Sequence, residues 1–282
     1  MSPIEQRIKA KIEAVGTPLK DWDININFGI KTGLNNAFII TGEKKDVLIA
    51  EDPKSAEIIR PILRGRDIKR YNYDFADLWL IYIPWHFPLQ NDSSIKGASI
   101  IAEQAFEEQY PAIYRHLLKH KTELSERNKA ETGVRYEWYA LQRWGANYWE
   151  DFSKHKIVWK RVGSILRFSY DESGIMALDS TCFATGTNIK YLVGVLNSCF
   201  GRYLMKDAPQ TGTGDLLISV QAIAPLNIPI PLPSNLSEIE ELVDRKIEHP
   251  TSEVESKIND ILYKICDFTE EEIEYITYKS LS

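Results

Sequence analysis

The segment NIKYLVGVLNSCFGRYLM at residues 188–205 constrains the fold more than any other part of the chain. It predicts a helix that begins after Asn188 as the N-cap and is apolar around most of its surface. A helix of this kind must be buried deep in a core. The 282-residue chain is 44% hydrophobic and 26% charged, which is typical of a globular protein that can build such a core.

The other apolar segments are short. The longest runs, such as LWLIYI at 78–83, fall far below the roughly 20 residues of a membrane helix, so we expect no membrane contact. Pro111 is expected to begin a second helix within the polar region 97–128, because a proline inside a helix would break it. The pattern as a whole predicts a mixed α/β (α+β) fold with flanking helices and a C-terminal helical segment. The expected strands are 37–40, 47–50, 78–84, 156–161, 165–170 and 180–185, and the expected terminal helices are 2–15, 237–247 and 252–265, followed by a short helix with a Thr269–Glu272 capping box.

Charge is distributed unevenly along the chain. The net charge is −6, but residues 236–282 hold 13 acidic and 5 basic side chains. Residues 1–235 are left with 29 basic and 27 acidic side chains, a net charge of +2. We therefore place a boundary at 233–236, between a mildly basic body (1–235) and an acidic helical tail (236–282). Such an asymmetry is a reason to look for a polyanion site in the body.

The expected compartment is the cytoplasm. Cys182, Cys199 and Cys266 are too few and too scattered for a disulfide framework or a zinc site. The first residues, MSPIEQRIKAKIEAV, are charged and amphipathic and do not resemble a secretory signal.

Catalytic signatures are missing from the sequence. GIKTG at 29–33 lacks the spacing of a phosphate-binding loop, and no apolar strand leads into QTGTGD at 210–215, which we expect to be a flexible loop. His116 and His120 have the i, i+4 spacing of metal ligands, but a solvated helix face explains them better. One alternative remains open: Asp23, Glu43 and Lys45 form a D…E-x-K pattern that holds Mg²⁺ in nucleases.

Three stretches combine cations, amides and aromatic residues, the mixture that a nucleic-acid surface needs for phosphates and bases. Each also has a structural interpretation: a turn at Asn35 and Asn36, an ion pair of Arg66 or Arg64 with Asp67, and a core role for the aromatic residues of 136–149. The candidate contacts are Lys31, Thr32, Asn35 and Asn36 in the first stretch, Arg64, Arg66, Lys69, Arg70 and Tyr71 in the second, and Gln142, Arg143, Lys160 and Arg161 in and after the third.

The order of these motifs resembles the TaqI-like C-terminal specificity domain. The motifs that carry the resemblance are GIKTGLNNAFII, PILRGRDIKRY, EWYALQRW leading into KIVWKR, YLVGVLNSCFGRYL, ISVQAIAPLNIPIPLP and the tail SEIEELVDRKI…EVESKINDILYKICDFTEEEIEYI.

This resemblance implies the target recognition domain of a type IIG restriction–modification enzyme or an N6-adenine DNA methyltransferase. The S-adenosylmethionine loop and the catalytic Asn/Asp-Pro-Pro-Tyr motif of that family are not found here, so no enzymatic activity is expected of this chain itself. S-adenosylmethionine and Mg²⁺ would bind in the catalytic parts of a longer enzyme, of which this chain would be the C-terminal part.

The expected partners are double-stranded DNA and the methyltransferase or nuclease part of the same enzyme. Lysines and arginines of 64–70 and 154–167 would contact phosphates, while Arg, Asn and Gln side chains would read base edges. The tail would pack on the domain itself or on the methyltransferase part. A second alternative is a protein-interaction module whose acidic tail docks a partner subunit.

Overall fold

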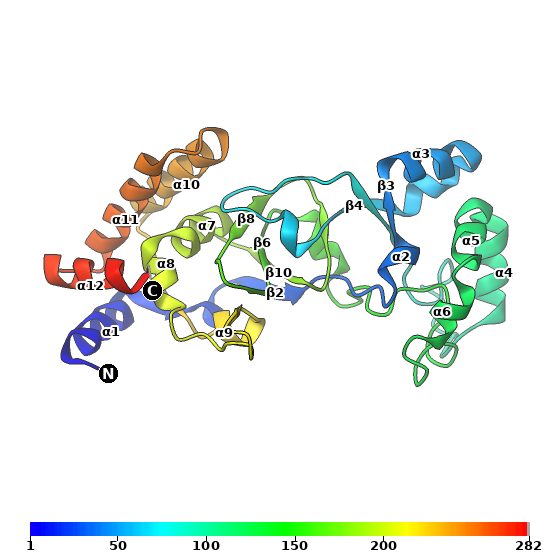
Figure 1. The fold of residues 1–282 in the computed structure, drawn as a ribbon, viewed down its shortest axis with the longest axis horizontal. Coiled ribbons are helices and arrows are strands. Elements are labelled where there is room, and N and C mark those ends of the chain that lie inside the picture. Colours follow the sequence, from blue (N-terminus) through cyan, green and yellow to red (C-terminus); the bar gives the residue numbers. More distant parts are fainter. Residues whose placement is uncertain (281–282) are drawn as a thin grey trace.

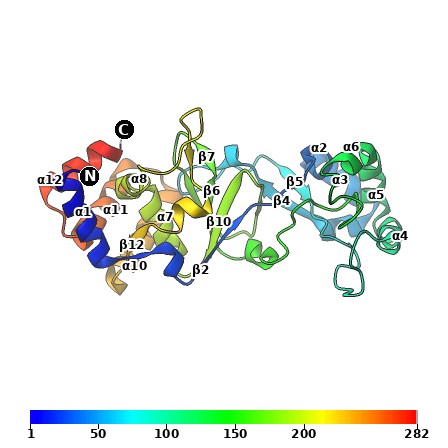
Figure 2. The ribbon, with the colours of Figure 1, turned by 90° about the horizontal axis from the view of Figure 1, so that it is seen from below.

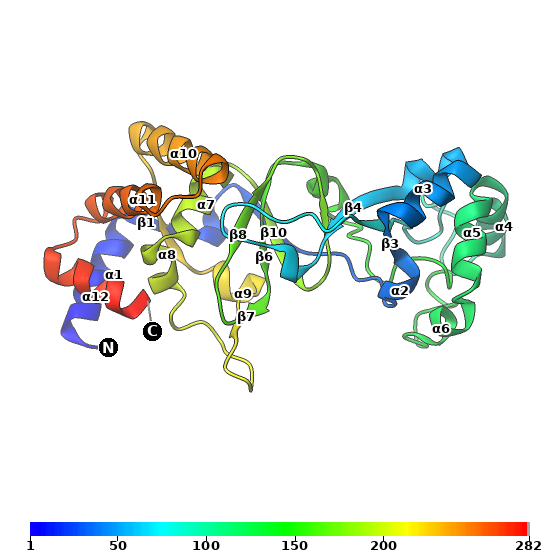
Figure 3. The same cartoon turned by 45° about the horizontal axis from the view of Figure 1, so that its top comes forward.

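In the computed structural model, which describes residues 1–280, a four-stranded antiparallel sheet lies in the middle of an elongated molecule (Figure 1). A block of helices lies at one end of the sheet and a smaller lobe with its own sheet at the other (Figures 1 and 3). The predicted mixed α/β fold with flanking and C-terminal helices is confirmed. The strands follow the order β2 (Ile24–Phe28), β10 (Thr181–Gly186), β6 (Lys156–Lys160) and β8 (Phe168–Asp171).

Both faces of this central sheet are buried. Successive side chains of a strand point to opposite faces. In β6, Ile157 and Trp159 pack into the core of the helical block, whereas Val158 packs into the core of the smaller lobe. In β10, Cys182 faces the first core and Phe183 the second. The sheet therefore forms a shared wall between two cores, and for this reason its inner strands β10 and β6 are buried on both faces.

The helical block is built on α7 (Ile189–Asn197) and α8 (Cys199–Leu204). The predicted burial is confirmed, since every residue of α7 except Lys190 is buried. The prediction of one helix is wrong, because Ser198 ends α7 and caps α8 by accepting a hydrogen bond from the backbone N–H of Gly201 at 3.0 Å. Asn188 precedes α7 with a φ of 55° and makes no side-chain capping bond, so its predicted capping role is also wrong.

The acidic tail packs on α7 and α8. Gly194 lets α10 approach α7 closely, because a Cβ at this position would lie 2.8 Å from the Cγ2 atom of Ile239. The predicted Thr269–Glu272 capping box is confirmed, with the Thr269 N–H 2.9 Å from the carboxylate. The proposed division of the chain at 235 stays a prediction, and residues 281–282 of the tail lie outside the described residues. The tail helices are α10 (Pro233–Glu248), α11 (Ser252–Ile265) and α12 (Glu270–Ser280).

The first helix, α1 (Pro3–Val15), lies beside α12 (Figure 1). Glu272 is almost fully buried between them and forms an ion pair with Lys11 at 2.7 Å. Arg7 pairs with Glu271 at 2.7 Å. The two ends of the described chain are thus held together by ion pairs at one end of the molecule.

The smaller lobe has a sheet of strand order β3–β5–β4–β9. Pro111 occupies the first turn of its own helix, as predicted. The predicted strand at 47–50 is wrong: Thr41 caps a helix by accepting a bond from the Lys44 N–H at 3.2 Å, and the helix continues through 47–50. The elements are α2 (Asn35–Phe38), β3 (Ile39–Thr41), α3 (Gly42–Glu51), a 3₁₀ helix (Pro53–Ile58), β4 (Ile59–Leu63), β5 (Leu78–Ile81), α4 (Ile100–Gln109), α5 (Pro111–Leu118), α6 (Lys121–Glu126) and β9 (Met176–Ala177).

Two small antiparallel ribbons complete the fold. One pairs β1 (Gly16–Pro18) with β12 (Asn227–Pro229), and the other pairs β7 (Val162–Gly163) with β11 (Leu216–Leu217). No helix among residues 1–280 is both long and apolar enough to cross a membrane. The remaining short elements are α9 (Val220–Ile223) and the 3₁₀ turns Leu19–Asp21, Gly65–Asp67 and Trp149–Ser153.

The burial of α11 predicts a large effect on stability. Ile258 is fully buried in the core that the tail shares with α7 and the central sheet. Replacing it with alanine (Ile258→Ala) removes buried methyl groups and leaves a cavity, which should lower the free energy of unfolding by about 2–5 kcal/mol. Urea unfolding followed by circular dichroism measures this change. Ile100→Ala is the matched control, because Ile100 is 75% exposed, and its effect should stay within about 0.5 kcal/mol. Equal effects of both substitutions would contradict the shared core.

Candidate nucleic-acid interface

The segment 177–181 joins two of the three predicted stretches. On one side, the Ile30 N–H donates to the carbonyl of Ala177 at 2.7 Å, and the Asp179 N–H donates to the carbonyl of Ile30 at 2.9 Å. On the other side, the Leu178 N–H donates to the carbonyl of Leu63 at 3.0 Å. The loop that follows β2 and the stretch that begins at β4 therefore lie on either side of one segment.

The same segment also forms hydrogen bonds with the residue that follows β6 and with the turn at Gly65. The Ser180 hydroxyl accepts a hydrogen bond from the Gly65 N–H at 3.1 Å, and its carbonyl accepts one from the Arg161 N–H at 3.0 Å. A Cβ on Gly65 would lie 3.0 Å from Cγ of Lys160, so the turn packs directly on the lysine stem. Arg66, which follows Gly65, is thereby brought close to Lys160 and Arg161.

The third stretch is joined by a pair of backbone bonds. The Lys31 N–H donates to the Arg143 carbonyl at 3.0 Å, and the Arg143 N–H donates back at 2.9 Å. The Arg161 guanidinium lies 5.9 Å from the ring centre of Phe28, at the end of the strand that leads to Lys31. The structure thus brings the three predicted stretches together where the two lobes meet.

Four cations at this meeting point form what we call the junction cluster: Lys31, Arg66, Lys160 and Arg161. The first three are exposed, and Arg161 is half-buried. Within residues 1–280, none of the four makes a side-chain hydrogen bond or an ion pair, and the Arg161 guanidinium lies over the Phe28 ring. Their charges are therefore available to an anionic ligand.

The other cations of 61–75 are engaged within the protein. Arg64 donates from its backbone N–H and its Nε to one oxygen of Asp67, at 2.8 and 3.0 Å, and from Nη2 to the other at 2.7 Å. Asp67 is only 5% exposed. Arg64 therefore closes the turn at Gly65–Asp67, as the structural interpretation of this pair predicted. Lys69 lies 3.3 Å from Asp74 in an exposed ion pair.

Arg70 and Tyr71 contact the helical block, and the Arg70 side chain remains 33% exposed. Arg70 forms an ion pair with Glu255 of α11 and also donates to the carbonyl of Asn197. The Tyr71 ring is 1% exposed, and its burial raises the pKa of the hydroxyl. Neither side chain presents a free group to a ligand, so we leave both out of the interface.

The loop at 31–36 is shaped by its own side chains. Thr32 is buried and donates from its hydroxyl to Oδ1 of Asn35 at 2.6 Å, at the start of α2. Asn36 is exposed and makes no side-chain hydrogen bond in the described part of the chain. Thr32 and Asn35 therefore have a structural role in the turn, and Asn36 is the amide of this loop that is free to bind.

In the third stretch, most aromatic residues belong to the core of the smaller lobe. Tyr136, Trp138 and Tyr139 are buried, as the core interpretation predicted. Gln142 is half-buried, and a Cβ on the neighbouring Gly33 would lie 2.9 Å from its Oε1 atom. Arg143 is exposed and pairs with Glu131 at 3.0 Å.

Arg127 is a structural residue of this region that the sequence did not indicate. Its guanidinium is buried and donates to the carbonyls of Thr32, Trp138 and Ala140, so it ties the first stretch to the third. Burial lowers the pKa of Arg127 to about 10, which still leaves it charged at neutral pH. Arg127 lies in a polar segment after α6, so the sequence does not predict that it is buried. Its partners are backbone carbonyls, which every residue carries and which therefore leave no pattern in the sequence.

The cations of 154–167 also divide into side chains that are paired within the protein and side chains that are not. Lys154 pairs with Asp151 at 2.7 Å. Lys156 is fully buried in an ion pair with Asp171, its direct neighbour on β8, so the expectation that it contacts phosphate is wrong. Arg167 is half-buried and has no ion pair among the described residues.

The proposed nuclease triad is not assembled. Asp23 precedes β2 in the central sheet, while Glu43 and Lys45 lie on α3 in the smaller lobe (Figure 1). In the part of the chain that the structure describes, no group of three or more His, Cys, Asp or Glu side chains is placed to hold a metal ion. The nuclease hypothesis based on these residues is therefore wrong. His116, one of the two spaced histidines, binds the carbonyl of Ala37 at 2.9 Å instead.

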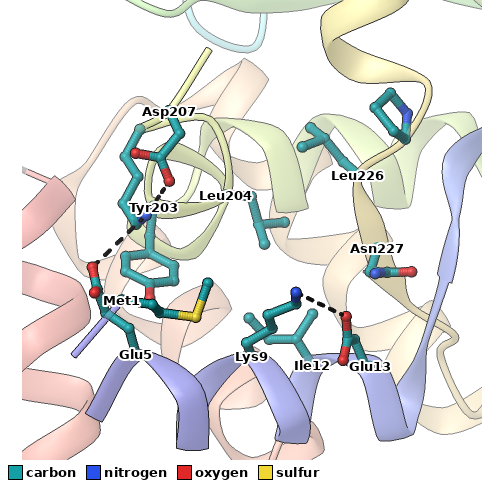
Figure 4. A pocket seen from close by; sticks show the side chains of 12 residues that line it. Met1, Glu5, Lys9, Ile12, Glu13, Tyr203, Leu204, Asp207, Leu226 and Asn227 are labelled. Carbon is teal, nitrogen blue, oxygen red and sulfur yellow. Dashed lines mark hydrogen bonds and ion pairs between the residues drawn. The ribbon is translucent and has the colours of Figure 1, made fainter. Parts of the chain in front are cut away.

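A groove of about 460 Å³ lies in the helical block, between α1, α8 and residues 225–227 (Figure 4). Its charged residues occur in pairs: Lys9 lies 3.7 Å from Glu13, and Lys206 lies 4.0 Å from Glu5. None of the predicted contact residues lines it. The cavity therefore adds nothing to the junction cluster.

The Arg64–Asp67 pair predicts a pH-dependent loss of stability on substitution. Burial alone would raise the pKa of Asp67, but the bonds from Arg64 outweigh it and hold that pKa below its ordinary value of 3.8. The carboxylate therefore stabilises the fold above about pH 4, and this contribution is lost as the pH falls through the lowered value. Asp67→Asn should cost about 1.5–3 kcal/mol at pH 7 and progressively less in acid. Urea unfolding at several pH values measures this, and a pH-independent cost would count against the pair.

Comparisons with known proteins identify the family of the chain and structures of similar fold. A model of the TaqI-like C-terminal specificity domain matches residues 60–226, more than half of the chain. No curated protein matches the sequence. Among solved structures, the fold is similar to the type IIL restriction–modification enzyme MmeI, solved in complex with DNA, with a TM-score of 0.63 and 13% identity over 93% of this chain and 35% of that one.

The fold is also similar to the type IIG restriction endonuclease BpuSI, with a TM-score of 0.55 and 13% identity over 98% of this chain and 32% of that one. The chain thus spans about a third of the length of each enzyme. At this identity the two structures establish the fold alone, and the family is established by the match over 60–226. The chain belongs to the TaqI-like C-terminal specificity domain family.

Proposed function

We propose that this chain is a sequence-specific double-stranded DNA recognition domain. It would select the target for a type IIG restriction–modification enzyme or an N6-adenine DNA methyltransferase. Membership of a specificity domain family supports this proposal, as does the fold shared with an enzyme solved in complex with DNA.

The junction cluster is the observation that carries the proposal. Its members come from three segments that are far apart in the sequence, and each keeps its charge unpaired within residues 1–280 although the chain as a whole carries a net charge of −6. Most other cations near the junction have carboxylate partners, including Arg64, Arg70 and Lys154. Unpaired cations gathered in one place suit the phosphate backbone of DNA.

The side chains around the junction suggest a division of roles. Lys31, Arg66, Lys160 and Arg161 would contact phosphates and set the register of the domain on the duplex. The amides of Asn36 and Gln142 are the neighbouring groups suited to base edges, with a preference for adenine in the major groove.

Recognition would take place without catalysis by this chain. Methyl transfer from S-adenosylmethionine, and Mg²⁺-dependent cleavage where the enzyme has it, would belong to the other parts of a longer protein that acts on DNA in the cytoplasm. The tail carboxylates of Asp244, Glu255 and Glu272 pair with cations of residues 1–235. No observation favours the alternative role of the tail as a docking site for a partner subunit.

Removing a junction cation should weaken DNA binding in a non-specific way. Lys160→Ala or Arg66→Ala deletes one phosphate contact, so affinity should fall by a similar factor for all duplex sequences. The slope of log affinity against log salt should become shallower by about 0.9 for each substitution. Fluorescence anisotropy with labelled duplexes between low and moderate salt measures both quantities.

Lys264→Ala is the matched control, because Lys264 is an exposed lysine of α11, in the tail. It should leave both affinity and salt slope unchanged. An affinity of the unaltered chain that does not depend on salt would rule out phosphate binding by the junction cluster.

The chain should leave DNA chemically unchanged. Incubated with supercoiled plasmid and Mg²⁺, it should produce neither nicked nor linear product on an agarose gel. With radiolabelled S-adenosylmethionine, it should transfer no methyl group to the plasmid. Cleavage or labelling that survives extensive purification would show that the chain has a catalytic site of its own.

A further inference from the structure

The ribbon formed by β7 and β11 carries a loop that projects from the body of the molecule. The loop spans residues 209–215, PQTGTGD, and Figures 2 and 3 show it extending away from the central sheet. A Cβ added to Gly212 or to Gly214 would meet no atom within 4 Å, so the tip is surrounded by open space. A cavity of about 650 Å³, lined among others by Gln210, Gly214 and Arg202, separates the loop from α8.

The loop makes hydrogen bonds of its own, and its predicted flexibility stays a prediction. The Thr211 N–H donates to the Asp215 carbonyl at 2.8 Å, and the Gly214 N–H donates to the Thr211 carbonyl at 3.0 Å. The hydroxyls of Thr211 and Thr213 lie 2.9 Å apart. Gly214 has a φ of 85°, a conformation that glycine adopts without cost. Hydrogen bonds that are already formed reduce the conformational entropy that a loop loses when it binds.

The base of the ribbon is attached to the junction cluster. The Ile218 N–H, directly after β11, donates to the Arg161 carbonyl at 2.8 Å. A Cβ on Gly163 of β7 would lie 3.5 Å from Nζ of Lys160. Lys160 and Arg161, two of the four cations that would contact phosphates, therefore lie at the point where the ribbon leaves the body.

The tip itself carries a different chemistry. Residues 209–214 contain no charged side chain and no large apolar one, while Asp215, at the base of the loop, accepts a hydrogen bond from the Thr213 hydroxyl at 3.3 Å. Gln210 and Thr213 are exposed, and the Gln210 amide makes no side-chain hydrogen bond in the described chain. The tip thus presents amide, hydroxyl and methyl groups, which are the groups that pair with base edges rather than with phosphates.

We infer that the β7–β11 ribbon inserts its 209–215 loop into the major groove of the bound duplex and reads bases there. The major groove is wide enough for a two-stranded ribbon, an amide such as that of Gln210 pairs with adenine, and threonine methyl groups contact the methyl group of thymine. Lys160 and Arg161 would hold the phosphates at the groove edge while the uncharged tip enters it. This inference rests on the proposed function and adds a specificity-determining element to it.

Selection from randomised duplexes at low salt tests the inference with three variants of the full chain. Gln210→Ala removes the exposed amide and Thr213→Val removes a hydroxyl at similar volume. Gln6→Ala is the matched control, since Gln6 is an exposed glutamine of α1 in the helical block. Gln210→Ala or Thr213→Val should lower the preference for one or two bases of the selected sequence by about fivefold or more. The salt slope and the remaining positions should not change.

The outcomes separate the inference from the proposed function. If the unaltered chain selects a sequence and both loop variants select it equally well, the ribbon does not read bases, although the domain does. If Lys160→Ala and the loop variants all weaken binding uniformly, the loop contacts the backbone only and base reading is overturned. If the unaltered chain selects nothing, the proposed function fails together with the inference. A changed preference in the Gln6→Ala control would also overturn it.

Discussion

Each face of the central sheet packs into a different hydrophobic core, and the rest of the molecule is arranged around this sheet. Trp159 and Cys182 close the core of the helical block, while Val158 and Phe183 close the core of the smaller lobe. Neither lobe can be removed without exposing one face of the same strands to water. The segments that cross from one lobe to the other must pass the ends of these strands, and the junction cluster forms at that crossing.

Pairing of charges inside the protein decides which cations remain for a ligand. The sequence shows a mildly basic body and an acidic tail, which suggests a body with free positive charge. In the structure, the tail carboxylates Glu255, Glu272 and Asp244 neutralise body cations on α1, on α7 and after β4. These ion pairs engage cations that contact the helical block, whereas the four cations of the junction cluster form no ion pair within residues 1–280.

Local patterns in the sequence predicted the elements whose causes are local. The helix start at Pro111 and the capping box at Thr269 depend on residues within one turn, and both are present. Two kinds of error remain: a local helix cap that the composition concealed, and partners that lie far away in the sequence. Residues 47–50 have a strand-like composition, but a helix begins at the Thr41 cap and continues through them. Arg70 pairs with Glu255, which lies 185 positions away in the sequence.

The candidate interface was predictable from the sequence to the same limited extent. Motif order was enough to identify the family, and the three stretches that it singled out do meet in space. The sequence of these stretches does not show which side chains remain free. Arg70 and Tyr71, for example, pack against the helical block, which other parts of the chain form. Arg127 donates to three backbone carbonyls and lies over the rings of Phe38 and Tyr136, and no sequence pattern predicts these contacts. Fold and family were thus predictable, whereas the selection among candidate residues required the packed structure.

The meeting of α1 and α12 has a consequence for how such a unit can be moved between proteins. The ion pair of Lys11 with Glu272 holds α1 and α12 side by side, so the first and last helices that the structure describes lie at one place on its surface. A unit with this geometry can be grafted into a host chain as an insert, without stretching the host. The graft would have to include residues 3–15 and 233–280 together. A cut at residue 235 would remove the helices that pack on α7 and would expose Gly194 and its neighbours to solvent.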